Sequence, residues 1–410
     1  MSLTLILIIT ILAEFFGRYW MKPHILTHDD IIFAIKLMAV NIGLQFAFII
    51  YQGGLIGLQK QLELNYLLIG TGLGRSLGAV LLLKLTIPTI QVFFICQIII
   101  NIVQLILGRY LMWRSLPKEG IRAHFTPSML RPLKSFILGI GLTSIIGIAL
   151  GQLDKIILSK MLSLEAFGYY VFAFTAAGVL AIIATAISTA TYPRLTQLVE
   201  QGNTLELSRV YHTSCQMVSV LLIPTGLTIS LFSKEILILW TGDVKLANNA
   251  SPFISILVIS FILMGLMLIP YSLQLAHSWT KLGMYANILS IVILLPLLIK
   301  LTSKYGAQGA CYVWVLLYAA QMIAMIPIMH GRLLKNEKWK WYLDDVGRPV
   351  AVSMVILIPG YIFMGKNIQN NIQMFLIIGI LLLTSIFACM LITPRIRSML
   401  IDRLTSLRHT

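Results

Sequence analysis

The chain has 410 residues, of which 58% are hydrophobic and only 11% are charged, and its formal net charge is +16. Water-soluble chains carry about a quarter charged residues, so this composition excludes an ordinary soluble protein. The positive charge alone would suit a nucleic-acid-binding protein. Here the basic residues gather in connections between apolar runs, where they set membrane topology and meet anionic lipid headgroups. We therefore expect no nucleic-acid partner.

Twelve stretches of the chain are long and apolar enough to cross a membrane, and short loops join them. A helix needs roughly 20 apolar residues to cross about 30 Å of hydrocarbon, and it satisfies its own backbone hydrogen bonds there. The runs are continuous rather than alternating, which disfavours a β-barrel. We predict an all-α, polytopic membrane protein with spans at Ser2–Arg18, Ile31–Leu58, Tyr66–Leu85, Ile90–Trp113, Ser135–Asp154, Phe167–Tyr192, Ser214–Phe232, Pro252–Ala276, Leu282–Leu301, Tyr305–His330, Pro349–Gly365 and Ile372–Thr393.

The distribution of Lys and Arg predicts the orientation of these spans. These residues cluster after the fourth span, after the tenth span and in the C-terminal tail. With twelve spans, all three segments fall on the same side of the membrane, and the positive-inside rule makes that side cytoplasmic. We therefore expect both termini in the cytoplasm.

No motif in the sequence indicates a cofactor or a metal. The four cysteines lie within or at the edges of spans without CxxC spacing, and the seven histidines are scattered. We interpret the cysteines as small apolar packing residues. The sequence has no GxxxxGK[ST] loop for a nucleotide, so an ion gradient is the expected energy source. The hydrophilic connections are too short to fold alone, which places any activity in or between the helices.

Arg75 lies near the middle of the third predicted span, in the glycine-rich run at 70–78. A cation at that depth costs roughly 2.5–3.5 kcal/mol on insertion scales, so it should face a protein interior or a hydrated cavity. The glycines would let a neighbouring helix approach closely. One interpretation is a binding group for an anionic substrate. The other is structural, with Arg75 paired to a carboxylate or reaching toward the headgroups.

The second predicted span carries three further polar residues, Lys36, Asn41 and Gln45. Lys36 lies about one and a half turns inside the span, and the other two lie deeper. Because Asn41 and Gln45 are four residues apart, they share one helix face. We predict a polar stripe that lines a cavity, and we count these residues with Arg75 as candidate substrate-binding groups.

Asp154 follows a long apolar run at the end of the fifth predicted span and precedes Lys155. Partial burial raises the pKa of a carboxyl, so Asp154 is a candidate site for a coupling proton or cation. A structural role is the alternative, with Asp154 paired to Lys155 or to a neighbouring helix.

Five short motifs together resemble a known family. They are Tyr51–Lys60 (YQGGLIGLQK), Gly151–Leu158 (GQLDKIIL), Glu165–Tyr170 (EAFGYY), Tyr192–Leu195 (YPRL) and Lys304–Ala310 (KYGAQGA). Their order and spacing are similar to those of Wzx-type polysaccharide flippases, which belong to the multidrug/oligosaccharidyl-lipid/polysaccharide exporter superfamily.

The resemblance also predicts how the spans are grouped. Such proteins usually begin with two helices that carry an earlier copy of the FGYY element, and no copy precedes Ser2. The chain therefore resembles one that starts at the family's third helix. This predicts a four-span bundle at 1–126, a six-span bundle at 127–345 and a helix pair with a basic tail at 346–410. A division into six and six spans is the alternative.

The resemblance implies a flippase rather than an enzyme. It would move an undecaprenyl-pyrophosphate-linked oligosaccharide repeat across the bacterial inner membrane by alternating access, for O-antigen and lipopolysaccharide synthesis. A cationic, hydrated cavity would lower the cost of removing water from the charged headgroup. The expected partners are the lipid-linked oligosaccharide, membrane lipids and other polysaccharide-assembly membrane proteins. An ion-coupled drug exporter of the same superfamily, a membrane-embedded polysaccharide polymerase and a structural remnant are the alternatives.

Overall fold

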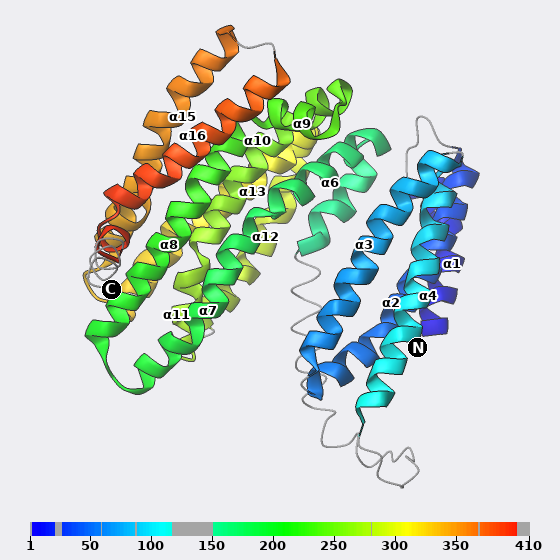
Figure 1. The fold of residues 1–410 in the computed structure, drawn as a ribbon, viewed down its shortest axis with the longest axis horizontal. Helices are drawn as coiled ribbons and strands as arrows, with labels where there is room; N and C mark the ends of the chain where they lie inside the picture. Colours follow the sequence, from blue (N-terminus) through cyan, green and yellow to red (C-terminus); the bar gives the residue numbers. More distant parts are fainter. Residues whose placement is uncertain are drawn as a thin grey trace, which may run out of the picture. The chain divides into compact units, whose positions relative to one another are not determined.

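The computed structural model describes residues 2–20, 27–58, 60–86, 88–116, 151–279, 281–367 and 370–399. The elements of the described residues are helices (Figure 1). The chain forms two compact units, Met1–Gly147 and Ile148–Thr410.

Within the described residues, 11 helical stretches are long and apolar enough to cross a membrane. They correspond to all the predicted spans except Ser135–Asp154, most of which lies outside the described residues. The described part of that span begins a helix at 151–161, which continues beyond the predicted end at Asp154. The prediction of an all-α, polytopic membrane protein is thus confirmed.

The described part of the first unit contains four long helices. They are α1 (Ser2–Phe15), which continues as a π-helical segment at Phe16–Trp20, α2 (His28–Gly57), α3 (Gln61–Leu85) and α4 (Ile90–Ser115). Helix α2 packs against α1 and α4, and α3 packs against α4. Thr89 starts α4, because its side-chain oxygen accepts a hydrogen bond from the Val92 amide, which would otherwise lack a partner at the helix end.

The second unit begins with the helix at 151–161. It continues through α6 (Leu164–Gly178), α7 (Leu180–Glu200), α8 (Thr204–Leu231), α9 (Ser233–Thr241), α10 (Val244–Leu266), α11 (Leu268–Ala276), α12 (Lys281–Tyr305), α13 (Ala307–Arg332), α14 (Lys338–Lys340), a π-helical segment at Trp341–Gly347, α15 (Arg348–Asn367) and α16 (Asn371–Ile392). Two of the candidate spans are interrupted helices, since α6 and α7 meet at Val179 and α10 and α11 meet at Met267.

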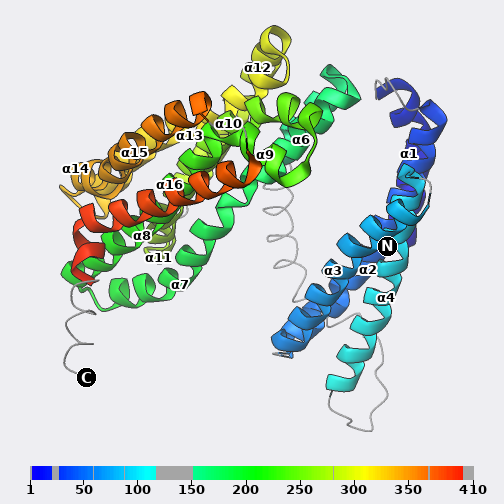
Figure 2. The same ribbon diagram turned by 45° about the horizontal axis from the view of Figure 1, so that its top comes forward.

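Helix α10 lies at the centre of the second unit and packs against α6, α7, α8, α9 and α13. Helices α15 and α16 pack on each other and along α8, as the turned view shows (Figure 2). The C-terminal helix pair is therefore part of the second unit. The residue boundaries predicted at 126 and 345 are not tested by this packing and stay a prediction.

Two glycines explain the KYGAQGA motif, which forms the turn between α12 and α13. Gly306 has φ of 59° and ψ of −143°, a conformation that side chains other than hydrogen strongly disfavour. A Cβ atom on Gly309 would lie 2.1 Å from the carbonyl oxygen of Leu301. The motif therefore allows the two helices to meet with backbone against backbone.

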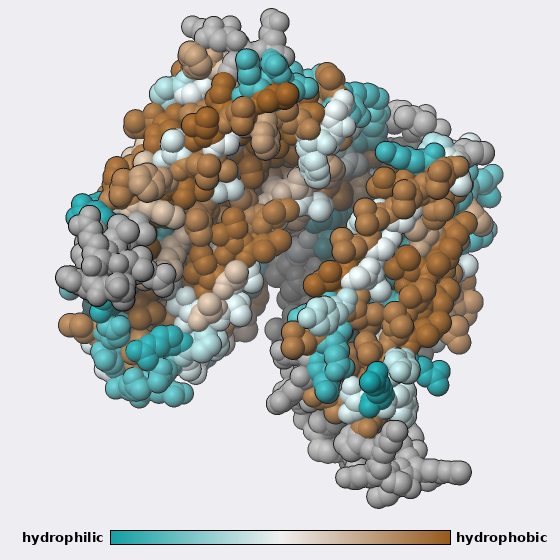
Figure 3. All heavy atoms as spheres, in the orientation of Figure 1, coloured by the Kyte–Doolittle hydropathy of each residue, from teal (hydrophilic) through white to brown (hydrophobic). Residues whose placement is uncertain are grey.

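The surface of both units is apolar along the helices. Large hydrophobic side chains such as Leu7, Ile106, Ile182 and Leu383 are exposed. Hydrophobic residues cover the visible sides of the helices, and hydrophilic residues gather near helix ends (Figure 3). A soluble protein rarely exposes so much apolar surface, but a lipid bilayer covers it without cost.

Candidate functional site

Arg75 lies on α3 and its side chain is half-buried. Its Nε atom donates a hydrogen bond to the backbone carbonyl of Thr71 at 3.4 Å, on the same helix. Among the described residues it forms no ion pair with a carboxylate. One structural interpretation requires an acidic partner for Arg75. The described part of the chain provides no such partner. The terminal guanidinium nitrogens of Arg75 donate no hydrogen bond to another described residue.

The glycine-rich face beside Arg75 brings α3 close to α4. A Cβ atom on Gly78 would lie 3.2 Å from the sulfur of Cys96, and one on Gly74 would lie 3.6 Å from Ile100. A shallow hollow of ≈ 270 Å³ opens between the two helices, lined mainly by apolar side chains together with Gly70, Thr71 and Gly74. The hollow has no charged lining residue, so it does not bind an anion by itself.

The three polar residues of α2 occupy different environments. Asn41 is buried, and its Nδ2 atom donates to the carbonyl of Phe94 on α4 at 3.3 Å. Gln45 is exposed and Lys36 is half-buried. Lys36 has no hydrogen bond or ion pair among the described residues. Asn41 and Gln45 therefore do not form one uniform stripe, and their role in substrate binding stays a prediction.

The sequence interpretation missed Asn101 on α4, which is the partner of Asn41. Its Nδ2 atom donates to Oδ1 of Asn41 at 2.8 Å, and both side chains are buried. A hydrogen bond between two spans stabilises their contact where no water is present. The sequence did contain a signal, because Asn101 and Gln104 interrupt a run that is otherwise almost wholly apolar.

Asp154 is fully buried, with 0% exposure, in the helix at 151–161. The hydroxyl of Tyr170 on α6 donates to its Oδ2 atom at 2.6 Å, and Nε1 of Trp314 on α13 donates to the same oxygen at 3.2 Å. Nε1 of Trp314 also donates to the Tyr170 hydroxyl at 3.1 Å. Three helices thus meet at one carboxylate.

Lys155 supplies the charge that balances Asp154. Its Nζ atom lies 3.4 Å from Oδ1 of Asp154 and 3.9 Å from the ring centre of Phe174. The same ammonium group donates to the carbonyl of Gly151 at 3.2 Å. Both structural partners expected for Asp154 are therefore present: the adjacent lysine and neighbouring helices. A buried carboxylate is retained at low cost only when it is paired in this way.

Tyr170 and Trp314 are site residues that the sequence does not identify. Tyr170 belongs to the EAFGYY motif, whose resemblance to a family indicates no role for its hydroxyl. Trp314 lies in an apolar span, where an indole usually serves for packing. Its nitrogen is a donor only, and buried indole nitrogens usually have a partner. A Trp in the middle of a span is therefore a usable signal for a buried acceptor.

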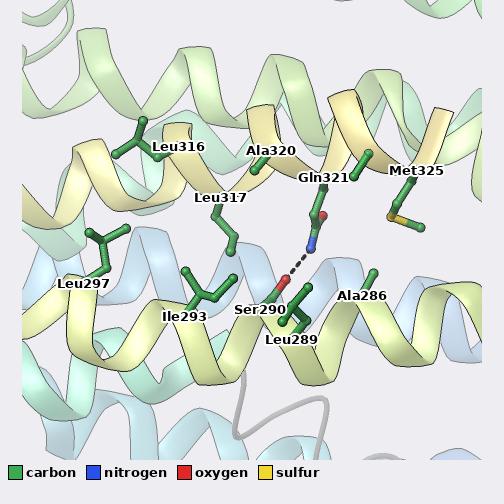
Figure 4. A pocket seen from close by; sticks show the side chains of 11 residues that line it. Ala286, Leu289, Ser290, Ile293, Leu297, Leu316, Leu317, Ala320, Gln321 and Met325 are labelled. Carbon is green, nitrogen blue, oxygen red and sulfur yellow. Dashed lines mark hydrogen bonds between the residues drawn. The ribbon is translucent and has the colours of Figure 1, made fainter. Parts of the chain in front are cut away.

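The polar residues Ser290 and Gln321 lie in an otherwise apolar pocket of ≈ 380 Å³ between α12 and α13. Nε2 of Gln321 donates to Oγ of Ser290 at 2.8 Å across this pocket (Figure 4). Leucine, isoleucine, alanine and methionine form the rest of the lining. The pocket contains no charged side chain, so it suits a hydrocarbon chain and not a charged headgroup.

Comparison with known proteins identifies part of the second unit. Residues 139–299 match the MatE family. This matched segment covers 161 of the 410 residues. It contains Asp154, Lys155 and Tyr170, whereas Trp314 lies beyond its matched end. The matched segment includes the GQLDKIIL, EAFGYY and YPRL motifs, on which the resemblance to the superfamily partly rests.

Two further comparisons extend beyond the segment that matches the MatE family. The chain is 24% identical over 295 residues to a putative O-antigen transporter from Shigella flexneri, a match that covers 70% of this chain and 67% of the relative. The structure of the lipid II flippase MurJ in an inward closed conformation matches with a TM-score of 0.72 and 15% identity. That match covers 98% of this chain and 82% of MurJ.

These comparisons confirm the resemblance to the exporter superfamily. At 15% identity, the MurJ match shows a shared fold and nothing about residues. The relative is named as a putative O-antigen transporter, and the matching structure is named as a flippase. The candidate spans in the described residues make this chain a multi-pass membrane protein.

Proposed function

We propose that this protein is a flippase that moves an undecaprenyl-pyrophosphate-linked oligosaccharide repeat from the cytoplasmic to the outer leaflet, for O-antigen synthesis. The observation that carries the proposal is the similarity to a putative O-antigen transporter along 70% of the chain. The MurJ-like fold supports it, because it is the fold of a protein named as a lipid II flippase.

The substrate-binding group in this proposal is Arg75. A guanidinium at membrane depth is costly to insert, and this one has no carboxylate partner among the described residues. Its planar donors match phosphate oxygens in a bidentate arrangement. Lys36 adds a second cation on α2 without a partner in the described part of the chain. Asn41 serves mainly to hold α2 against α4, because its side chain is engaged with Asn101.

The ion-coupling group in this proposal is Asp154. In its charged form the carboxylate holds Tyr170, Trp314 and Lys155. A proton on Asp154 would remove the charge that balances Lys155 and would give one oxygen a hydrogen to donate. Both changes weaken the contacts among the helix at 151–161, α6 and α13. Proton binding would therefore shift the balance between two packings of the second unit, which alternating access requires.

Loss of the gene tests this function in cells. The proposal predicts that lipid-linked repeat units accumulate in the cytoplasmic leaflet and that surface polysaccharide disappears. Complementation with the wild-type chain should restore both. If surface polysaccharide were unchanged and tolerance to drugs fell instead, the protein would be a drug exporter of the same superfamily.

A further inference from the structure

A second buried cluster of ionisable groups lies where α8 meets the segment at 337–347. His212, on α8, is fully buried, and its two ring nitrogens face two carboxylates. Nδ1 lies 2.5 Å from Oδ2 of Asp345. Nε2 is hydrogen-bonded to Oε2 of Glu337. None of these residues contacts Asp154, whose partners lie on other helices.

The geometry requires one proton beyond a neutral imidazole and two carboxylates. Each of the two contacts needs a hydrogen between nitrogen and oxygen, because both atoms otherwise present lone pairs to each other. A neutral imidazole carries only one N–H group. Either His212 is an imidazolium, or one of the two acids is protonated. Loss of this proton would leave two acceptors facing each other in a buried site, which is costly.

The remaining contacts of Asp345 do not neutralise its charge. Nε2 of Gln216 donates to its Oδ1 atom at 2.8 Å, and Oε1 of Gln216 accepts a hydrogen bond from the Arg395 amide at 3.1 Å. Asp345 forms no ion pair with Lys or Arg among the described residues. The proton shared with His212 is therefore the direct counter-charge of this buried carboxylate.

Other ionisable groups surround the cluster on every packed element. They are Tyr211 and Cys215 on α8, His330 on α13, Lys338 and Lys340 on α14, and Arg395 in the C-terminal segment. Lys340 carries a positive charge near Glu337, and Arg395 carries one near Asp345. Neither cation forms an ion pair with a described carboxylate.

A metal ion does not suit this cluster. The two carboxylates lie at opposite nitrogens of the imidazole ring, so the three side chains share no point at which an ion could be coordinated. The described residues include no group of three or more His, Cys, Asp or Glu side chains that could hold a metal. A proton is the ligand that fits.

Of the three side chains in the cluster, only that of Glu337 reaches the surface. The Glu337 side chain is 24% exposed, whereas the side chains of His212 and Asp345 are 0% exposed. Glu337 and Lys340 line a cavity of ≈ 670 Å³ at the face where α8 begins, which we predict to be cytoplasmic. Burial raises the pKa of Glu337, but hydrogen bonds from Ser208 and His212 and the charge on His212 outweigh it and hold the pKa below its usual value. Glu337 is thus the charged entrance residue.

We propose that His212, Asp345 and Glu337 form a proton-binding site that exchanges with the cytoplasmic side through Glu337. The proton holds the π-helical segment at Trp341–Gly347 on α8, because both contacts of His212 reach across to the segment at 337–347. Interruptions of α-helical geometry by π-turns are frequent at functional sites. This site is independent of the substrate that the protein carries.

Infrared difference spectroscopy of the full-length protein in lipid nanodiscs, recorded as pH is changed, tests the proposal. With isotope-labelled histidine, we expect the titration of the wild-type protein to include, among the signals of its seven histidines, one signal that depends on His212. His212→Gln should remove it, and Asp345→Asn, which keeps the Glu337 carboxylate beside the ring, should lower its midpoint. Asp344→Asn is the matched control: this neighbouring acid pairs with Arg348 at 2.8 Å, and its loss should leave the signal unchanged.

Glu337→Gln provides a second test if the buried variants fail to fold. It removes a negative charge beside the proton, so the signal should persist with a midpoint lower by about one pH unit. The proposal is wrong if the titration of a folded His212→Gln protein shows every signal that the wild-type protein shows. An unchanged midpoint in Glu337→Gln would contradict the entrance role of Glu337. Because transport is not measured, these outcomes do not depend on the proposed function.

Discussion

Arg75 is the residue whose replacement bears most directly on substrate binding. Arg75→Ala removes a cation that has no carboxylate partner in the described part of the chain, so transport should fall to background while insertion and folding remain normal. Arg75→Lys keeps the charge but loses the bidentate donors, so activity should be partial. Surface polysaccharide and the amount of protein in the membrane are the two measurements.

Arg109→Ala is the matched control for Arg75, because Arg109 is an exposed arginine near the end of α4 in the same unit. It should keep full activity. Normal polysaccharide in Arg75→Ala at native expression would contradict the substrate-binding role. A fall in membrane-inserted protein would instead indicate that Arg75 is needed for folding.

Asp154 is the residue on which ion coupling depends in this scheme. Asp154→Asn keeps an oxygen that can accept the hydrogen bonds from Tyr170 and Trp314 but cannot titrate. Transport by this variant should become independent of the proton gradient, which can be measured in vesicles with and without an imposed pH difference. A response equal to that of the wild type would exclude Asp154 as the coupling group.

The ion pair with Lys155 offers a purely structural explanation for any loss of transport in Asp154→Asn. A double variant separates this explanation from ion coupling. Asp154→Asn leaves the Lys155 ammonium without its carboxylate, at 18% exposure, and unpaired buried charges destabilise a protein. If pairing were the only role, Asp154→Asn with Lys155→Met should recover what the single change lost. If Asp154 couples an ion, the double variant should remain insensitive to the gradient.

At the scale of elements, the α12–α13 turn should tolerate no side chain at Gly309. The Cβ atom of Gly309→Ala would meet the Leu301 backbone at 2.1 Å, and a backbone cannot move aside as a flexible side chain can. We expect a loss of about 2–3 kcal/mol or more in the free energy of unfolding, measured as a fall in the thermal midpoint of the purified protein.

Gly331→Ala, near the end of the same helix, is the control for this change. No atom lies within 4 Å of the Cβ that it would add, so its stability should be equal to or slightly above that of the wild type. Equal midpoints for the two variants would show that α12 and α13 do not meet as closely as the structure indicates.

The elements themselves could be predicted from hydropathy, but their partners could not. A span is a local property, because about 20 apolar residues in a row predict a helix wherever they occur. Trp314 lies 160 residues from Asp154, and no local pattern relates them. Asn41 was expected to line a cavity with Gln45, whereas Asn101 on another helix holds it in a helix contact. Helix periodicity predicts the shared face but not what that face packs against.

At the scale of the whole molecule, the five motifs that resemble the flippase family say more about function than composition does. They indicate the superfamily by themselves, and three of them lie within the segment that matches the MatE family. The cluster around His212 could not be anticipated, because His212 lies 125 residues from Glu337 and 133 residues from Asp345, in a different hydrophilic connection between predicted spans. Isolated ionisable residues become a site only when the fold brings them together.

The measurement that tests the central claim most directly is flipping in a reconstituted system. The purified protein is placed in liposomes with a fluorescent lipid-linked oligosaccharide, and the fraction of headgroups protected from an added, membrane-impermeant glycosidase is followed over time. Proteoliposomes with the wild-type chain should exchange the headgroup between leaflets, and those with Arg75→Ala should behave like protein-free liposomes. Exchange at the protein-free rate with correctly folded wild-type protein would contradict the proposal that this protein moves lipid-linked sugars.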